Sequence, residues 1–162
     1  MDSSTVYLSI VVPMYNEETV IDIFFERIIP ILEDITPDYE IICVDDGSDD
    51  ETFSLLGKVH DKNPEIKILN LSRNFGKELA MTAGIDHAAG QAVIPLDADL
   101  QDPPELIAEL VEKWREGYDM AWQSASTGPA TARRSGSRRG CSIASSTGSA
   151  RYRFPKTSAI SA

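Results

Sequence analysis

Short apolar runs alternate with stretches of helical periodicity along the first 122 residues. The runs are rich in β-branched residues and predict strands buried on both faces at 7–12, 39–44, 66–71, 92–96 and 118–122. Between them, apolar residues three and four positions apart predict helices at 19–32, 53–59, 77–89 and 103–116. Ser48 or Asp49 is expected to cap the second of these helices.

The alternation of strands and helices predicts an α/β fold, a mostly parallel, doubly wound sheet with helices on both faces. The natural strand order for this pattern is 3-2-1-4, which makes the first and fourth strands neighbours at the topological switch point. Ligands of such sheets bind outside the carboxyl ends of the strands at that point. The loops expected there are 13–17 and 97–99, with Asp45 and Asp46 next to them.

Charge divides the chain at residue 122. All 26 acidic residues and 8 of the 15 Lys and Arg residues lie in 1–122, for a net charge of −18, whereas 123–162 hold 7 basic residues and no acidic one. The second segment has 25 Ser, Thr, Ala or Gly residues among 40 positions and no periodic apolar stripe, a composition typical of disorder. We therefore predict a domain at 1–122 and an irregular or disordered basic tail at 123–162.

Composition excludes several classes of protein. No window reaches the roughly 18 continuous apolar residues that a membrane-spanning helix needs, and the first residues lack the basic and apolar regions of a secretory signal. Two cysteines, Cys43 and Cys141, are too few for a disulfide framework, so a reducing compartment is expected. The acidic domain argues against nucleic acid as a partner, and an anionic ligand would need a metal ion or helix N-termini.

Two aspartates at the end of the fourth predicted strand are the strongest candidates for chemistry. The chain contains neither GxxxxGK[ST] nor a GxGxxG after its first strand, so another group must neutralise a phosphate. Asp97 and Asp99 are spaced to face one hard cation, Mg²⁺ or Mn²⁺, and Gln101 could add a carbonyl oxygen. The competing interpretation is helix capping, but the segment 102–105 supplies its own helix start.

Three further positions near the expected crevice have two interpretations each. Asp46 could accept hydrogen bonds from a base or ribose, or belong to an Asx-type turn. Tyr15 could stack on a base, or be a partly exposed loop tyrosine. Arg73 and Lys77 could hold a phosphate, or complement neighbouring carboxylates.

Four motifs in the same order resemble one enzyme family. The segments 9–18 (SIVVPMYNEE) and 40–52 (EIICVDDGSDDET) resemble the first two strands and loops of inverting nucleotide-sugar glycosyltransferases with the GT-A fold. The segments 72–78 (SRNFGKE) and 97–105 (DADLQDPPE) resemble the branch that glycosylates polyprenyl phosphates, namely the bactoprenol glucosyltransferases and dolichol-phosphate mannosyltransferases. The resemblance covers residues 7–122 and is not recognisable after residue 122.

The resemblance implies a function and a set of site residues. Such an enzyme would move a hexose, preferably glucose from UDP-glucose, onto a polyprenyl phosphate with inversion at the anomeric carbon. A Mg²⁺ or Mn²⁺ ion on Asp97, Asp99 and Gln101 would stabilise the leaving diphosphate, which makes Asp97 and Asp99 the candidate catalytic residues. The donor would be held by Pro13, Tyr15, Glu17, Val44, Asp46, Lys77, Asp97, Ala98 and Asp99.

The chain also departs from the family's pattern. The family's Gly-Asp-Phe-Arg-like acceptor segment, amphipathic helix and C-terminal membrane helices have no visible counterpart in it, so the chain is expected to be truncated and inactive. Family members act at the inner face of the cytoplasmic membrane, which implies a peripheral, cytoplasmic location. Two alternatives stay open, a non-catalytic nucleotide-sugar-binding fragment and a receiver-like phosphoacceptor domain.

A shift of reading frame is one explanation for residues 123–162. Dropping two bases from codons allowed for 156–162 permits Asp-Val-Gly-Asp-Phe-Arg, which resembles the missing acceptor segment. The same shift lets 141–148 encode a Phe-Tyr-Arg-Leu-Phe-Asn-like run, which again resembles the family. The alternative is a genuine basic tail that contacts anionic lipid.

Overall fold

The computed structural model of the chain describes residues 6–99, 103–118, 120–122 and 131–133. The chain divides into two units, Met1–Leu106 and Ile107–Ala162. Every residue that we assigned to a donor or metal site belongs to the first unit, and one of them, Gln101, lies outside the described residues. The domain boundary expected at residue 122 stays a prediction.

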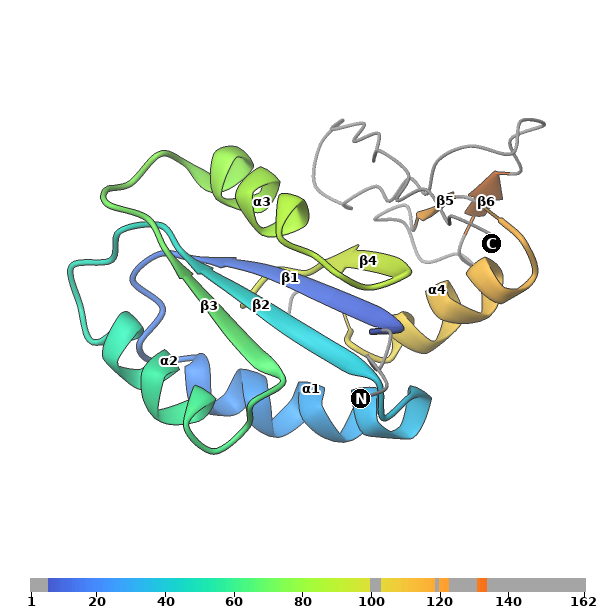
Figure 1. Cartoon of the computed structure of the whole chain (residues 1–162), viewed down its shortest axis with the longest axis horizontal. Coiled ribbons are helices and arrows are strands. Elements are labelled where there is room, and N and C mark those ends of the chain that lie inside the picture. The colour runs from blue at the N-terminus through green and yellow to red at the C-terminus, as the bar shows by residue number, and fades with distance from the viewer. Residues whose placement is uncertain (1–5, 100–102, 119, 123–130, 134–162) are drawn as a thin grey trace, which may run out of the picture. The chain divides into compact units, whose positions relative to one another are not determined.

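Four parallel strands form the sheet of the first unit (Figure 1). They are β1 (Leu8–Met14), β2 (Tyr39–Asp45), β3 (Ile66–Asn70) and β4 (Ala92–Pro95), in the order β3-β2-β1-β4. This is the order predicted from the sequence, and β1 and β4 are neighbours as the switch point requires. The apolar residues of the two central strands are almost completely buried, as expected for strands covered on both faces.

Helices cover both faces of this sheet. Figure 1 shows α1 (Ile21–Ile35) and α2 (Thr52–His60) on one face and α3 (Lys77–Asp86) on the other. The apolar stripe of α1 includes Phe24 and Ile28, both fully buried. On the opposite face α3 approaches the sheet so closely that a Cβ at Gly84 would lie 2.4 Å from Val11 Cγ1. A glycine at this position is therefore what allows α3 to pack on β1.

The second unit holds one helix and a short hairpin. The helix α4 spans Leu106–Arg115, and β5 (Met120–Trp122) pairs antiparallel with β6 (Thr131–Arg133). We expected residues 118–122 to continue the parallel sheet and residues 123–162 to be irregular. The strand expected at 118–122 is present as β5, but it takes its backbone hydrogen bonds from β6 in a separate two-stranded sheet and so is not part of the parallel sheet. Within 123–162, the described residues are those of β6. The remaining residues of 123–162 lie outside the described part of the chain.

Two helix ends differ from those predicted, namely the start of α2 and the end of α3. In each case a hydrogen bond to an acidic side chain accounts for the difference. The expected cap at Ser48 or Asp49 is wrong, because α2 begins later and the side chain of Asp50 accepts the Thr52 N–H instead (2.9 Å). The third helix was predicted to reach residue 89 but ends at Asp86. None of the helices within the described residues is long and apolar enough to cross a membrane.

The early end of α3 is set by a buried carboxylate on β2. Glu40 is 2% exposed and pairs in register with Ser9 of β1. Its Oε1 accepts hydrogen bonds from Ser9 Oγ (2.5 Å) and from the backbone N–H of Ala89 (2.7 Å), and its Oε2 lies 2.5 Å from Lys67 Nζ. Ser9 Oγ in turn accepts the Gly90 N–H. The backbone after α3 is therefore bound to the amino-terminal end of the sheet.

Replacing Glu40 with glutamine should make stability less dependent on acid pH. Burial raises the pKa of Glu40, but hydrogen bonds from Lys67, Ser9 and Ala89 outweigh it and leave the pKa below the ordinary 4.5. Ionised Glu40 thus contributes stability that is present above pH 4.5 and is lost as pH falls through the lower folded-state pKa. We expect E40Q to lower the free energy of unfolding by about 2–3 kcal/mol at pH 7.

Urea unfolding at pH 7 and in the acid range measures this difference. The deficit of E40Q relative to the parent chain should shrink as the pH falls below 4.5, because the parent chain then protonates Glu40. The control is Glu26→Gln, a change of the same charge at an exposed position of α1. A deficit that is the same at both pH values would show that the ionised form of Glu40 is not what stabilises the fold.

Candidate functional site

A cavity of about 240 Å³ lies at the carboxyl ends of the strands, at the switch point between β1 and β4. Three loops meet there, one after β1, one after β4 and one before α3, and the turn after β2 contributes one residue. The lining residues are Pro13, Met14, Tyr15, Glu17, Asp46, Asn74, Gly76, Lys77, Asp97, Ala98 and Asp99. The cavity is the place where a doubly wound sheet binds its ligand.

The loop after β1 is fixed by side chains of the loop after β2. Asn16 has a positive φ of 56°, and its backbone N–H donates to Ser48 Oγ (3.0 Å) while its own Oδ1 accepts the Asp49 N–H (2.9 Å). The next residue, Glu17, donates its backbone N–H to the buried hydroxyl of Thr52 (2.8 Å). These hydrogen bonds fix the backbone of the loop that carries the side chains of Tyr15 and Glu17.

Asp46 holds the loop that leads into α3. Its carboxylate is 3% exposed and accepts two backbone hydrogen bonds, from the N–H of Phe75 to Oδ1 and from the N–H of Gly76 to Oδ2, each 2.8 Å long. Hydrogen bonds to an ionised acceptor are stronger than neutral ones. Asp45, by contrast, forms the local turn that we considered for this segment, since its Oδ1 accepts both the N–H and the hydroxyl of Ser48.

Gly47 allows the same loop to approach the turn after β2. Its φ is +69°, and a Cβ there would lie 2.5 Å from the carbonyl carbon of Arg73. A side chain at this position is therefore excluded by both backbone conformation and space. Beyond this contact, the guanidinium of Arg73 lies 4.8 Å from the ring centroid of Phe75, a cation–π contact. The segment 73–76 is thus docked on residues 46–47.

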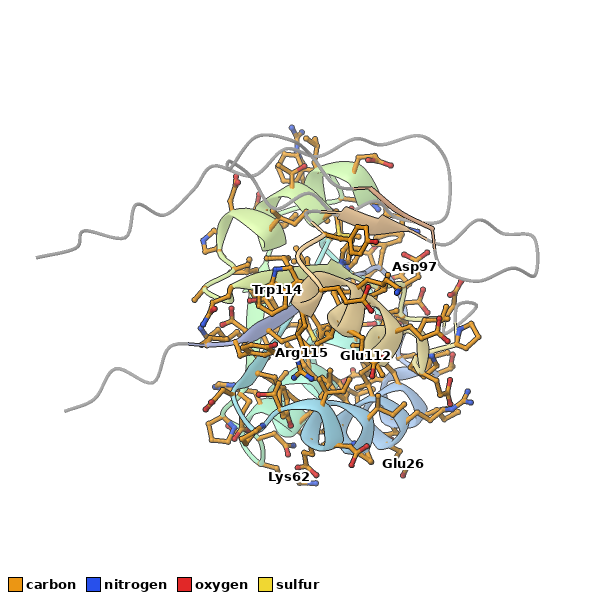
Figure 2. The ribbon with its side chains drawn as sticks, turned by 90° about the vertical axis from the view of Figure 1, so that its right-hand side faces the viewer. Glu26, Lys62, Asp97, Glu112, Trp114 and Arg115 are labelled. Carbon is orange, nitrogen blue, oxygen red and sulfur yellow. The ribbon has the colours of Figure 1, made fainter. Side chains whose placement is uncertain are left out.

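The first residue of α3, Lys77, contacts the loop that follows β4. Lys77 Nζ lies 2.8 Å from Asp97 Oδ2, and the two side chains are 53% and 20% exposed. Among the described residues that line the cavity, Lys77 carries the one basic side chain. Figure 2 shows Asp97 well separated from Glu26 and Lys62, which belong to the layer formed by α1 and α2.

Negative charge accumulates on the other side of the cavity. The pKa of Glu17 is raised by burial and, in decreasing order, by the charges of Asp99, Asp50 and Asp97. A raised pKa caused by neighbouring carboxylates means that these groups repel one another without a cation between them. Added positive charge would therefore be attracted to this side of the cavity.

A divalent metal ion fits these residues. Within the described part of the chain, no group of three or more His, Cys, Asp and Glu side chains is arranged to hold a metal by itself. Mg²⁺ and Mn²⁺ do not require one, since such ions are held by one or two carboxylates and take water and substrate phosphates as their other ligands. Asp97 and Asp99 offer hard oxygen ligands in a cavity where carboxylates repel one another.

The structure brings together most of the residues that the sequence singled out. Pro13, Tyr15, Glu17, Asp46, Lys77, Asp97, Ala98 and Asp99 all line the cavity. Val44 does not, because it is fully buried in the core, where its side chain approaches Gly84 of α3. The donor residues assigned from the sequence did not include Met14, Asn74 or Gly76, although Met14 lies in the loop 13–17 that was expected at the crevice. A signal for Asn74 and Gly76 was present, since they lie within the motif at 72–78.

The chain belongs to a family of sugar-transferring enzymes. The model of glycosyl transferase family 2 matches residues 9–155. The match covers the loops that form the cavity, and it extends past residue 122, where we expected the resemblance to end. With an α/β sheet and a cavity at its switch point, the chain is a family 2 glycosyltransferase domain. Family membership decides against a receiver-like phosphoacceptor domain.

Individual relatives agree with this assignment. An uncharacterized glycosyltransferase of Synechocystis sp. is 60% identical over 118 residues, which are 73% of this chain and 37% of the relative. A bactoprenol glucosyl transferase of Shigella phage SfV is 46% identical over 113 residues, again 37% of its length. The chain thus spans little more than a third of the curated relatives it matches.

A solved structure shares the fold. The mannosyltransferase PcManGT from Pyrobaculum calidifontis, determined in complex with GDP-Man and Mn²⁺, aligns with a TM-score of 0.57 at 26% identity. The alignment covers 65% of this chain and 31% of that protein. The predicted GT-A type of α/β fold is therefore confirmed for this part of the chain.

Proposed function

We propose that this domain binds UDP-glucose with Mg²⁺ or Mn²⁺ and belongs to an enzyme that transfers the glucose to a polyprenyl phosphate. The observation that carries the proposal is the cavity itself, in which Asp97 pairs with Lys77 and Asp99 lines the same space at the switch point of the sheet. The resemblance of segments 72–78 and 97–105 to the bactoprenol branch, and the phage relative of that name, favour glucose and the lipid acceptor.

The cavity residues have separate tasks in this proposal. Tyr15, which is 41% exposed, offers a ring face on which a base can stack. Asp97 and Asp99 would hold the cation, which when bound stabilises the charge that develops on the leaving diphosphate. Lys77 supplies a second positive charge for the diphosphate, and Glu17 adds to the negative potential that attracts the metal. Gln101 remains a proposed third ligand.

The proposed acceptor reduces the need for a general base in the domain. A polyprenyl phosphate is already an anion, so its oxygen can attack the anomeric carbon without a strong general base. Direct attack opposite the leaving diphosphate would invert the configuration at that carbon. An enzyme with such an acceptor works at a membrane surface, so we propose peripheral association with the inner face of the cytoplasmic membrane.

Thermal unfolding with a panel of nucleotide-sugars tests the donor proposal. UDP-glucose with Mn²⁺, at about 100 times its dissociation constant, should raise the free energy of unfolding by roughly 2.7 kcal/mol. GDP-mannose should give a smaller shift, and EDTA should abolish both, because the carboxylates then have no cation to share with the diphosphate. An equal shift by UDP-glucose in EDTA would contradict the metal-dependent site.

A transfer assay addresses the acceptor. The 162-residue chain, incubated with radiolabelled UDP-glucose and a short polyprenyl phosphate, is expected to bind donor and to form no lipid-linked product above blank, because the family's acceptor segment is not recognisable in its sequence. A longer protein that contains this domain should form the product. Clear product from the 162-residue chain would refute the expectation of inactivity.

A further inference from the structure

We propose that Lys77 is an exchangeable internal cation, which neutralises Asp97 before the donor binds and moves to the donor's diphosphate when a divalent metal takes its place. This inference rests on the proposed function, because it requires a metal-bound diphosphate in the cavity. It adds a role that neither the family match nor the relatives assign, namely competition between a lysine of the chain and the metal for the same carboxylate.

The ion pair is placed where a metal would have to bind. Lys77 Nζ contacts Asp97 Oδ2 at 2.8 Å, and both residues line the cavity together with Asp99 and Glu17. An ammonium ion this close to a carboxylate oxygen occupies one ligand position and repels an approaching cation. The free protein therefore has a lower affinity for a metal than its two aspartates alone would give.

The pair is also weak enough to be exchanged. The Lys77 side chain is 53% exposed, and exposed ion pairs contribute little stability because water screens them. A divalent cation bound by Asp97 and Asp99 together can therefore displace the ammonium. A lysine fits this task because its ammonium is a point charge on a flexible stem of four carbons.

The backbone that carries Lys77 does not need to move in this exchange. The two residues before it are fixed by Asp46, which accepts the N–H groups of Phe75 and Gly76. Gly76 itself has a φ of +98°, a conformation that directs the chain into α3 at Lys77. With its Cα fixed, the lysine side chain swings between Asp97 and whatever anion lies in the same cavity.

The exchange predicts coupling between metal and nucleotide. Without nucleotide, a metal that displaces Lys77 leaves the ammonium with poorer partners among the described residues of the cavity. Asp97 and Asp99 then hold the metal, Asp46 already accepts two backbone N–H groups, and Glu17 remains. With UDP present, the diphosphate offers the ammonium a new partner, so metal and nucleotide bind each more tightly in the presence of the other. By linkage the two enhancements must be equal.

Replacing Lys77 should change the two affinities in opposite directions. Mn²⁺ binding is measured by electron paramagnetic resonance without nucleotide, and UDP binding is measured by calorimetry in saturating Mn²⁺. We expect Lys77→Met to tighten Mn²⁺ binding about two- to five-fold, the range that corresponds to loss of an exposed ion pair. The same variant should weaken UDP binding and reduce the factor by which UDP enhances Mn²⁺ affinity.

Two further variants separate charge from structure. Lys77→Arg keeps a cation at this position and should leave Mn²⁺ affinity within about two-fold of the parent chain, a difference of roughly 0.4 kcal/mol. Lys62→Met removes the same charge from an exposed position in the layer of α1 and α2 and should change neither affinity. Together they exclude an effect of net charge alone.

The inference and the proposed function fail in different ways. If Lys77→Met leaves Mn²⁺ affinity unchanged or weakens it in the absence of nucleotide, the lysine does not compete with the metal and the inference is overturned. If the parent chain binds UDP-glucose equally well in EDTA, the proposed metal-dependent donor site is wrong. Tighter Mn²⁺ binding by Lys77→Met with weaker UDP binding supports the exchange.

Discussion

Replacing Asp99 with asparagine is expected to lower the affinity for UDP-glucose in Mn²⁺ by at least about 100-fold. Changing residues that merely support metal ligands already costs about 10–100-fold in metal affinity, and Asp99 is proposed to bind the ion directly. Asparagine keeps an oxygen of similar size but loses the charge that a hard cation requires. Isothermal titration calorimetry with Mn²⁺ and the nucleotide-sugar measures the change.

The free energy of unfolding should change little in Asp99→Asn. Asp99 is the first of the charges that raise the pKa of Glu17, so its neutralisation relieves repulsion in the cavity. We expect the free energy of unfolding of Asp99→Asn to stay within about 0.5 kcal/mol of the parent value or to rise. Asp61→Asn, an equal change of charge at an exposed position after α2, is the control for net charge. Unchanged donor affinity in Asp99→Asn would remove Asp99 from the metal site.

Truncation of Asp46 to alanine is expected to release the loop that carries Lys77. The N–H groups of Phe75 and Gly76 would lose their acceptors, and each buried donor left unsatisfied costs about 1–3 kcal/mol. Because the loop lies at the surface, water will satisfy part of this requirement, and we expect a loss of about 2 kcal/mol in the free energy of unfolding. Donor affinity should fall at least ten-fold, because Lys77 is no longer held in place.

Amide hydrogen exchange distinguishes this positioning role from a direct contact with the nucleoside. In the donor-free protein, the amides of Phe75 and Gly76 should exchange at least about ten-fold faster in Asp46→Ala than in the parent chain, since their acceptor is gone. Asp34→Ala, at an exposed position of α1, is the matched control. Loss of donor affinity with no change in exchange at these two amides would mean that Asp46 acts on the ligand and not on the loop.

Much of the site could be placed from the order of strands alone. Parallel strands buried on both faces have a simple apolar signature, and the order of β3, β2, β1 and β4 follows from connections that are short and right-handed. That order brings Tyr15, Asp46 and Asp97 to one cavity whatever their side chains contact. The order of the strands was therefore sufficient to locate the crevice, whereas the chemistry assigned to it stays a prediction.

The partners of the polar side chains could not be predicted in this way. The sequence left three possible partners for Asp46, namely a base, a ribose or its own turn. In the structure its carboxylate accepts hydrogen bonds from two N–H groups about thirty residues further along the chain. Lys77 could hold a phosphate or complement a carboxylate, and the structure shows it paired with the carboxylate of Asp97. The end of α3 likewise depends on Glu40, which takes the Ala89 N–H from a helix that local periodicity would continue.

This difference between strand order, which the sequence predicts, and polar contacts, which it does not, has a physical cause. Periodicity and strand order depend on which residues are apolar, and burial of apolar surface acts over a whole element without specifying a partner for any atom. Hydrogen bonds and ion pairs require donor–acceptor distances that are correct to within a few tenths of an ångström, between groups that only the register of the sheet brings together. The amino-acid sequence by itself thus determined the strands, their order and the location of the cavity. Only the tertiary structure decided that Asp46 binds the loop before α3 and that Lys77 neutralises Asp97.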